Sequence, residues 1–108
     1  MMKKYCFVIK LKKEHVEEYK EIHRNVWPEM LQAIQKAGAK EETLYIYENL
    51  SIVTFECEDL DEVYKKLGEE DVVKKWDATV GPWFESKSPN LEKIFDLNQQ
   101  LNGKLEQF

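Results

Sequence analysis

Residues that build the common catalytic and metal-binding motifs are scarce in this sequence of 108 residues. Its four glycines form no Gly-rich loop, which excludes a phosphate cradle of that type. Its two cysteines and two histidines show neither a CxxC pair nor the Cys/His spacing of a zinc site, so no metal is expected. No serine stands in a nucleophile elbow. Individual acid–base side chains remain as candidates for chemistry.

A surplus of positive charge is also lacking, because the formal net charge is −5 at pH 7. Binding to nucleic acid or to an anionic membrane needs a basic surface, so neither partner is expected. The apolar run near the N-terminus is broken by Lys10, and we expect neither a signal peptide nor a membrane-spanning helix. Cys6 and Cys57 are then expected to remain reduced in the cytoplasm.

The spacing of apolar residues predicts the order strand, helix, strand, strand, helix, strand. Apolar residues at every second position indicate strands, and apolar residues at steps of three and four indicate helices. These main elements are expected at residues 4–11, 14–37, 43–47, 50–57, 59–68 and 91–97. A shorter helix is expected at 70–79, followed by an irregular loop at 81–90 that contains Gly81, Pro82 and Pro89.

Several residues predict where the helices begin and end. Pro28 is expected to kink or restart the long helix near residues 25–28, with Asn25 as the cap of its second piece. Gly38 is expected to end that helix, and Asp59 to cap the next one.

This order of elements is typical of an α+β, ferredoxin-like fold, in which helices cover one face of a four-stranded antiparallel sheet. Residues 1–97 are expected to form one domain and residues 98–108 a polar tail. The first strand is apolar on both sides, since Cys6 and Val8 alternate with its larger apolar residues. A partner subunit is therefore expected on the second face, as in a homodimer of the α/β-barrel type.

His23 is the main candidate for chemistry, because imidazole exchanges protons near neutral pH. Tyr19 and Trp27 lie one helical turn on either side of it and could orient it or form an apolar wall. Residues at this spacing are more often packed in a core than part of a site. Trp76 could stack on a flat apolar face and Asp77 could accept hydrogen bonds from hydroxyls, although anchoring and solvation explain both as well.

Glu29 is a further candidate, as a second acid–base group just after Pro28.

The pattern Tyr-x-x-x-His-x-x-x-Trp-Pro-Glu, from Tyr19 to Glu29, closely resembles the L-rhamnose mutarotase family. The likeness continues through Gly38-Ala39, the expected hairpin, the Asp-Val-x-x-x-Trp segment at 71–76, and Ser88-Pro89 with the expected strand at 91–97. It covers all of the chain except the tail.

The resemblance implies an isomerase that interconverts the α and β anomers of a 6-deoxy-aldohexose, foremost L-rhamnose. It also implies a homodimer of ferredoxin-like subunits and no cofactor. The family's proton donor matches His23, a substrate-binding tyrosine matches Tyr19, and the first residue of a substrate-binding Trp-Trp pair matches Trp76. In ring opening, His23 would deliver a proton to the ring oxygen.

Two positions depart from the family pattern. Asp77 stands where the family has its second tryptophan, and the family's tyrosine at the start of the second strand is absent, with Glu41 and Glu42 nearest to it. A polar group in place of an apolar wall changes which hydroxyls can be paired, so L-fucose is an alternative substrate. A non-catalytic ligand-binding module and a cofactor-free oxygenase on the same fold are alternatives from other classes.

Overall fold

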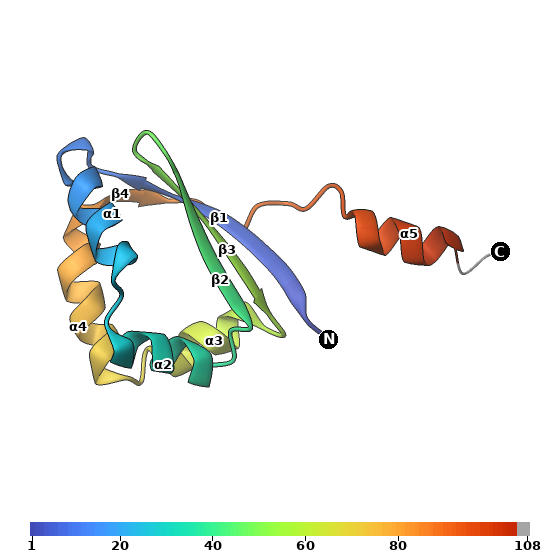
Figure 1. The fold of residues 1–108 in the computed structure, drawn as a ribbon, viewed down its shortest axis with the longest axis horizontal. Coiled ribbons are helices and arrows are strands. Elements are labelled where there is room, and N and C mark those ends of the chain that lie inside the picture. Colours follow the sequence, from blue (N-terminus) through green and yellow to red (C-terminus); the bar gives the residue numbers. More distant parts are fainter. Residues whose placement is uncertain (106–108) are drawn as a thin grey trace.

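The computed structural model describes residues 1–105, and its strands form one antiparallel sheet (Figure 1). The strands are β1 (Lys3–Leu11), β2 (Glu41–Tyr47), β3 (Leu50–Cys57) and β4 (Phe84–Lys87). Their order in the sheet is β2-β3-β1-β4, so the central strands β3 and β1 are neighbours and β2 and β4 form the edges. This order confirms the ferredoxin-like fold.

Four helices lie on one face of this sheet, and a fifth stands apart from it (Figure 1). The four are α1 (Val16–Arg24), α2 (Pro28–Lys36), α3 (Leu60–Leu67) and α4 (Asp71–Val80). The short 3-10 turns η1 (Lys13–His15) and η2 (Gly81–Trp83) lead into α1 and β4. The fifth helix, α5 (Leu97–Leu105), follows an extended segment, and residues 106–108 of the expected tail lie outside the described residues.

The expected restart of the long helix is confirmed, but its cap is not Asn25. Helix α1 ends at Arg24 and α2 begins at Pro28, with Trp27 as the N-cap residue and no side-chain cap hydrogen bond. Proline suits the first helical position because its φ is preset and it needs no N–H partner there. Asn25 instead follows α1 as its C-cap residue, too early to receive the first N–H groups of α2.

Two other expected helix boundaries are confirmed. Gly38 follows α2 with a φ of 107°, a left-handed conformation that favours glycine. Asp59 caps α3, since its carboxylate accepts a hydrogen bond of 3.3 Å from the backbone N–H of Glu62.

The expected last strand at 91–97 is wrong, because the chain pairs with β1 earlier. Helix α4 ends beside the end of β1, and β4 pairs there with Ile9–Leu11 directly after η2. Pro89 has no N–H to donate, so the regular strand ladder ends there. The hydroxyl oxygen of Ser88 accepts a hydrogen bond from the N–H of Val8. One more bond follows, from the N–H of Leu91 to the carbonyl of Cys6, and the alternating residues beyond it remain exposed.

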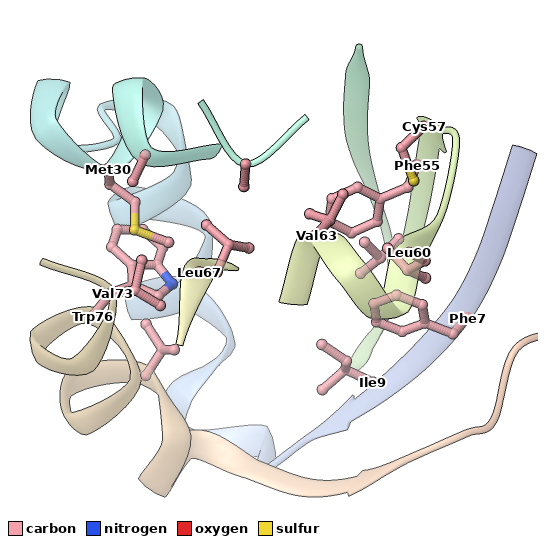
Figure 2. Close-up of a cluster of buried hydrophobic side chains, with 14 of the residues drawn as sticks. Phe7, Ile9, Met30, Phe55, Cys57, Leu60, Val63, Leu67, Val73 and Trp76 are labelled. Carbon is pink, nitrogen blue, oxygen red and sulfur yellow. The ribbon is translucent and has the colours of Figure 1, made fainter. Parts of the chain in front are cut away.

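The core lies between the sheet and the helices (Figure 2). Side chains of β1 and β3 form its sheet side, and those of α2, α3 and α4 form its helix side. The buried members include Phe7, Ile9, Leu11, Val53, Phe55 and Cys57 from the sheet and Met30, Val63, Leu67, Val73 and Trp76 from the helices. Because strand side chains alternate, every second residue of these strands points to the opposite, outer face of the sheet.

The outer face of the sheet is covered by none of the helices α1–α4 (Figure 1). Its side chains, fixed by the strand register, include Cys6, Val8, Tyr45, Tyr47, Leu50 and Ile52. Cys6 therefore lies on the outer face while Cys57 is in the core, and both thiols are free. No helix within residues 1–105 combines the length and apolar character needed to cross a membrane.

Candidate active site

A cavity of about 1020 Å³ lies between the sheet and the helices. It brings together four residues singled out by the sequence, namely Tyr19, His23, Trp76 and Asp77. Tyr19 and His23 come from successive turns of α1, and Trp76 and Asp77 come from α4. Its apolar floor is formed by β1 and β3 side chains such as Phe7 and Phe55. The volume is at the upper end of the range for small-molecule pockets, ~300–1,000 Å³.

Trp27 and Glu29 lie outside this cavity. Trp27 packs edge-on against Trp76, with ring centroids 5.1 Å apart, on the side away from the cavity lining. Glu29 is exposed at the start of α2, where it borders a separate surface depression together with Trp27. The structure therefore does not bring Glu29 to His23.

His23 is held in a defined orientation by its own helix. Its Nδ1 lies 2.7 Å from the carbonyl oxygen of Tyr19, and a carbonyl can only accept, so Nδ1 carries a hydrogen. In the neutral ring Nε2 then has a free lone pair. Burial lowers the pKa of His23 below its usual 6.5, and this effect outweighs the opposing hydrogen bond to Tyr19. His23 is therefore a neutral base at pH 7.

Tyr19 is buried, with only 3% of its surface exposed, and it packs inside the protein rather than facing solvent. Its hydroxyl is 2.7 Å from the Ser51 hydroxyl, which is fully buried on β3. Its ring lies against the His23 ring with centroids 4.3 Å apart. Burial raises the pKa of Tyr19, with a smaller contribution from the charge of Glu42. Tyr19 thus remains a neutral phenol that links α1 to β3.

Trp76 meets His23 in a T-shaped contact, with ring centroids 5.3 Å apart and planes at 89°. It is 8% exposed and lies between His23 on one side and Trp27 on the other. This arrangement limits the orientations available to the imidazole and gives the cavity one flat apolar wall.

The cavity also contains residues that the sequence did not indicate as site residues, among them Glu42 on β2, Tyr64 on α3 and Lys87 on β4. Glu42 was considered only as one of two positions nearest an absent tyrosine. Its signal was available, because extending the expected strand at 43–47 by one residue puts Glu42 on the same face as Leu44. Lys87 had no such signal, since its strand was expected to be a loop.

Glu42 belongs to the helix-facing side of β2. It pairs in register with Phe55, which is buried under α3, whereas Glu41 pairs with Glu56 on the outer face. The Glu42 side chain is exposed, but its exposed surface borders the cavity, where the surrounding walls reduce its hydration. This partial loss of hydration raises the pKa of Glu42 to about 7.

Asp77, Tyr64 and Lys87 also contribute to the polar lining. The Lys87 ammonium lies 4.4 Å from the centre of the Phe7 ring and 4.8 Å from that of Tyr64. Burial raises the pKa of Asp77, and the positive charge of Lys87 opposes the change. Burial also raises the pKa of Tyr64, and the negative charges of Glu42 and Asp77 raise it further by smaller amounts. Hydroxyl-rich ligands can therefore meet both donors and acceptors here.

No metal site accompanies this lining in the part of the chain that the structure describes. Within residues 1–105, no three His, Cys, Asp or Glu side chains gather closely enough to hold a metal ion. The chemistry available from these residues is proton transfer, from His23 and from the cavity carboxyls.

Comparison with known proteins gives the same family as the motif. The sequence profile of L-rhamnose mutarotase matches residues 4–99. An L-rhamnose mutarotase from Bacillus subtilis is 26% identical over 100 residues, which cover 91% of this chain and 95% of that protein.

Solved structures agree with the fold. The crystal structure of an L-rhamnose mutarotase from Formosa agariphila has a TM-score of 0.72 at 24% identity, covering 88% of this chain and 98% of the other. A dimeric ferredoxin-like protein from an uncultured marine organism has a TM-score of 0.56 at 11% identity, covering 86% and 90%. The profile covers nearly the whole domain, including His23 in the cavity lining, and the chain belongs to the L-rhamnose mutarotase family of isomerases.

Proposed function

We propose that this protein interconverts the α and β anomers of L-rhamnose, with His23 as the residue that transfers protons. Membership of the family supports the reaction. The observation that carries the role of His23 is its hydrogen bond to the Tyr19 carbonyl, which leaves the lone pair of Nε2 available on a residue that lines a cavity large enough for a monosaccharide.

The reaction opens and recloses the sugar ring without any net change of atoms or electrons. The anomeric hydroxyl loses its proton, the C1–O1 bond becomes a double bond, and the bond from C1 to the ring oxygen breaks. The ring oxygen takes up a proton. Rotation about C1–C2 and reversal of these steps give the other anomer. General acid–base help of this kind is worth about 10² to 10⁴-fold in rate.

The protonation state of His23 sets the order of its steps. Because neutral His23 has its hydrogen on Nδ1, it first accepts a proton at Nε2 and can donate one only afterwards. We therefore infer that His23 takes the proton of the anomeric hydroxyl, and that it can pass a proton to the ring oxygen only once it is charged. Trp76 would pack on the apolar face of the sugar, while Asp77 would accept hydrogen bonds from its hydroxyls.

The substrate is best tested by anomer exchange, measured by saturation-transfer NMR with L-rhamnose, L-fucose and ordinary aldoses. We expect faster exchange with L-rhamnose than with the aldoses that carry a 6-hydroxyl. Faster exchange with L-fucose than with L-rhamnose would show that L-fucose is the substrate, while the proposed reaction would stand. A protein that shifts the sugar signals without accelerating exchange would be a binding module, which would refute the proposed activity.

We also propose that two copies of the chain form a homodimer through the outer face of the sheet. That face carries apolar side chains, among them Ile52 and Val8, and Tyr45 and Tyr47 are 62% and 64% exposed in the single chain. Ile94 and Phe95, in the segment that leads to α5, are 87% and 61% exposed. Exposed apolar surface of this extent is typical of an interface.

Replacing Ile52 by lysine is expected to convert the dimer into a monomer, because a charge would be buried at the centre of the paired sheets. Sedimentation at several protein concentrations measures the change. Leu31→Lys is the matched control, since Leu31 is 54% exposed on α2 and away from the outer face. A monomeric wild-type protein, or an unchanged mass for Ile52→Lys, would contradict the proposed interface.

A further inference from the structure

Ring opening needs an acid for the ring oxygen as well as a base for the anomeric hydroxyl, and resting His23 is only the base. Its Nδ1 hydrogen is committed to the Tyr19 carbonyl, and Nε2 carries a lone pair. A second group that carries a proton in the resting enzyme would let both transfers occur in one step. Such a proton-carrying group would have to lie in the cavity lining, within reach of the sugar.

Glu42 is the cavity carboxyl best situated for this role. It faces the cavity from the sheet side, on β2, while His23 faces it from the helix side, on α1. Tyr19, which also lines the cavity, lies against His23, and the charge of Glu42 adds a small part to the raised pKa of Tyr19. Within the described residues, no hydrogen bond or ion pair occupies the Glu42 carboxylate.

We propose that Glu42 is a second catalytic acid–base residue, which donates a proton to the ring oxygen while His23 removes the proton of the anomeric hydroxyl. The C1–O5 electron pair goes to the ring oxygen as it is protonated, and Glu42 becomes a carboxylate while His23 becomes an imidazolium. On reclosure His23 returns its proton to O1, and Glu42 recovers the proton from the former ring oxygen. Both residues regain their starting states.

The electrostatic surroundings of Glu42 are consistent with this role. A pKa of about 7 leaves a large fraction of Glu42 protonated at neutral pH. Burial raises the pKa of Asp77 too, but there the ammonium of Lys87 opposes the rise, and no such opposing charge acts on Glu42. The titratable and charged groups that line the cavity around Glu42 are Tyr19 and His23 on α1, Tyr64 on α3, Asp77 on α4, Lys87 on β4, and Lys40 and Glu41 next to it in the chain.

The pH dependence of kcat/KM follows from these directions. The reactive form has Glu42 protonated and His23 neutral. Raising the pH through about 7 deprotonates Glu42, so kcat/KM falls on the alkaline side. Lowering the pH protonates His23, and since its pKa lies below 6.5, the acid fall occurs below that pH. A variant that lacks the Glu42 carboxyl should therefore lose the fall in kcat/KM at alkaline pH.

The test, which rests on the proposed mutarotase function, is anomer exchange of L-rhamnose by Glu42→Gln, measured from about pH 5 to about pH 9 with the uncatalysed rate subtracted. We expect kcat to fall by about 10²-fold with a smaller change in KM, and the alkaline fall to disappear. Glu42→Asp should restore part of the rate and an alkaline fall at a shifted pH. Glu62→Gln is the control, because Glu62 is an exposed carboxylate on α3 that does not line the cavity, and this variant should keep the alkaline fall.

Thermal unfolding of each variant separates loss of catalysis from loss of fold. Wild-type rates in Glu42→Gln, or a reduced rate with the alkaline fall intact, would overturn the proposal while leaving the mutarotase function standing. If Glu42→Gln does not fold, an unshifted alkaline fall in Glu42→Asp overturns it. A wild-type protein without exchange activity would remove the proposed function and this role together.

Discussion

Replacing His23 by asparagine lowers the rate of L-rhamnose anomer exchange by about 10² to 10⁴-fold, the range expected for loss of a general acid–base group. Asparagine can still offer an N–H toward the Tyr19 carbonyl, where His23 places its Nδ1 2.7 Å away. It cannot supply the proton-accepting Nε2. The expected loss therefore lies in kcat, with KM changed less, because the cavity walls remain in position.

His15 provides the matched control for this experiment. It is the other of the two histidines, it stacks on Trp83 with ring centroids 5.9 Å apart, and its Nδ1 contacts Glu18 at 3.1 Å. It does not line the cavity, so His15→Asn should exchange anomers at the wild-type rate. Equal rates for the wild type and His23→Asn would remove His23 from the mechanism. Equal losses in both variants would point to a general effect of histidine replacement.

Replacing Trp76 by alanine lowers the free energy of unfolding by about 3–5 kcal/mol, the cost of emptying a buried indole site. Trp76 is 8% exposed and packs against both His23 and Trp27. Its removal would open the wall that fixes the imidazole, so the exchange rate should fall as well. Trp76→Phe keeps an aromatic wall and should lose less of both quantities.

Urea unfolding at a fixed protein concentration measures this change, because dimer formation would make stability depend on concentration. Trp83→Ala is the comparison, since Trp83 is only partly buried and lies outside the cavity. Its loss should be smaller. A destabilisation below about 1 kcal/mol in Trp76→Ala would contradict the packing described for this residue.

The element types could be read from the sequence because they depend on local spacing. The period-two pattern from Tyr5 to Leu11 and the helical steps around Tyr19 and His23 are repeated within one or two turns. The break at Pro28 and the cap at Asp59 are likewise local, since each depends on one side chain and its immediate neighbours. Tyr19 and His23 are one turn apart on α1, and that proximity follows from helix geometry alone.

The last strand could not be read in this way, because alternation alone does not decide which segment pairs with β1. The residues from 91 to 97 alternate well but leave the sheet, whereas the four residues Phe84–Lys87 pair with β1. The position at which α4 ends decides which of the following residues lie beside β1. That position depends on the packing of α4 on the sheet, which involves residues far apart in the sequence.

The cavity residues also fall into two groups, those placed by local sequence and those placed by contacts between distant segments. Local patterns in the sequence are enough to predict the fold class, the family motif and the placement of Tyr19 beside His23. Contacts between distant segments bring Glu42, Asp77 and Lys87 into one cavity with His23 and leave Glu29 and Trp27 outside its lining. The physical reason is register: a shift of one residue in β2 would turn Glu42 to the outer face and Glu41 inward, and that register is set by pairing with β3 across the sheet.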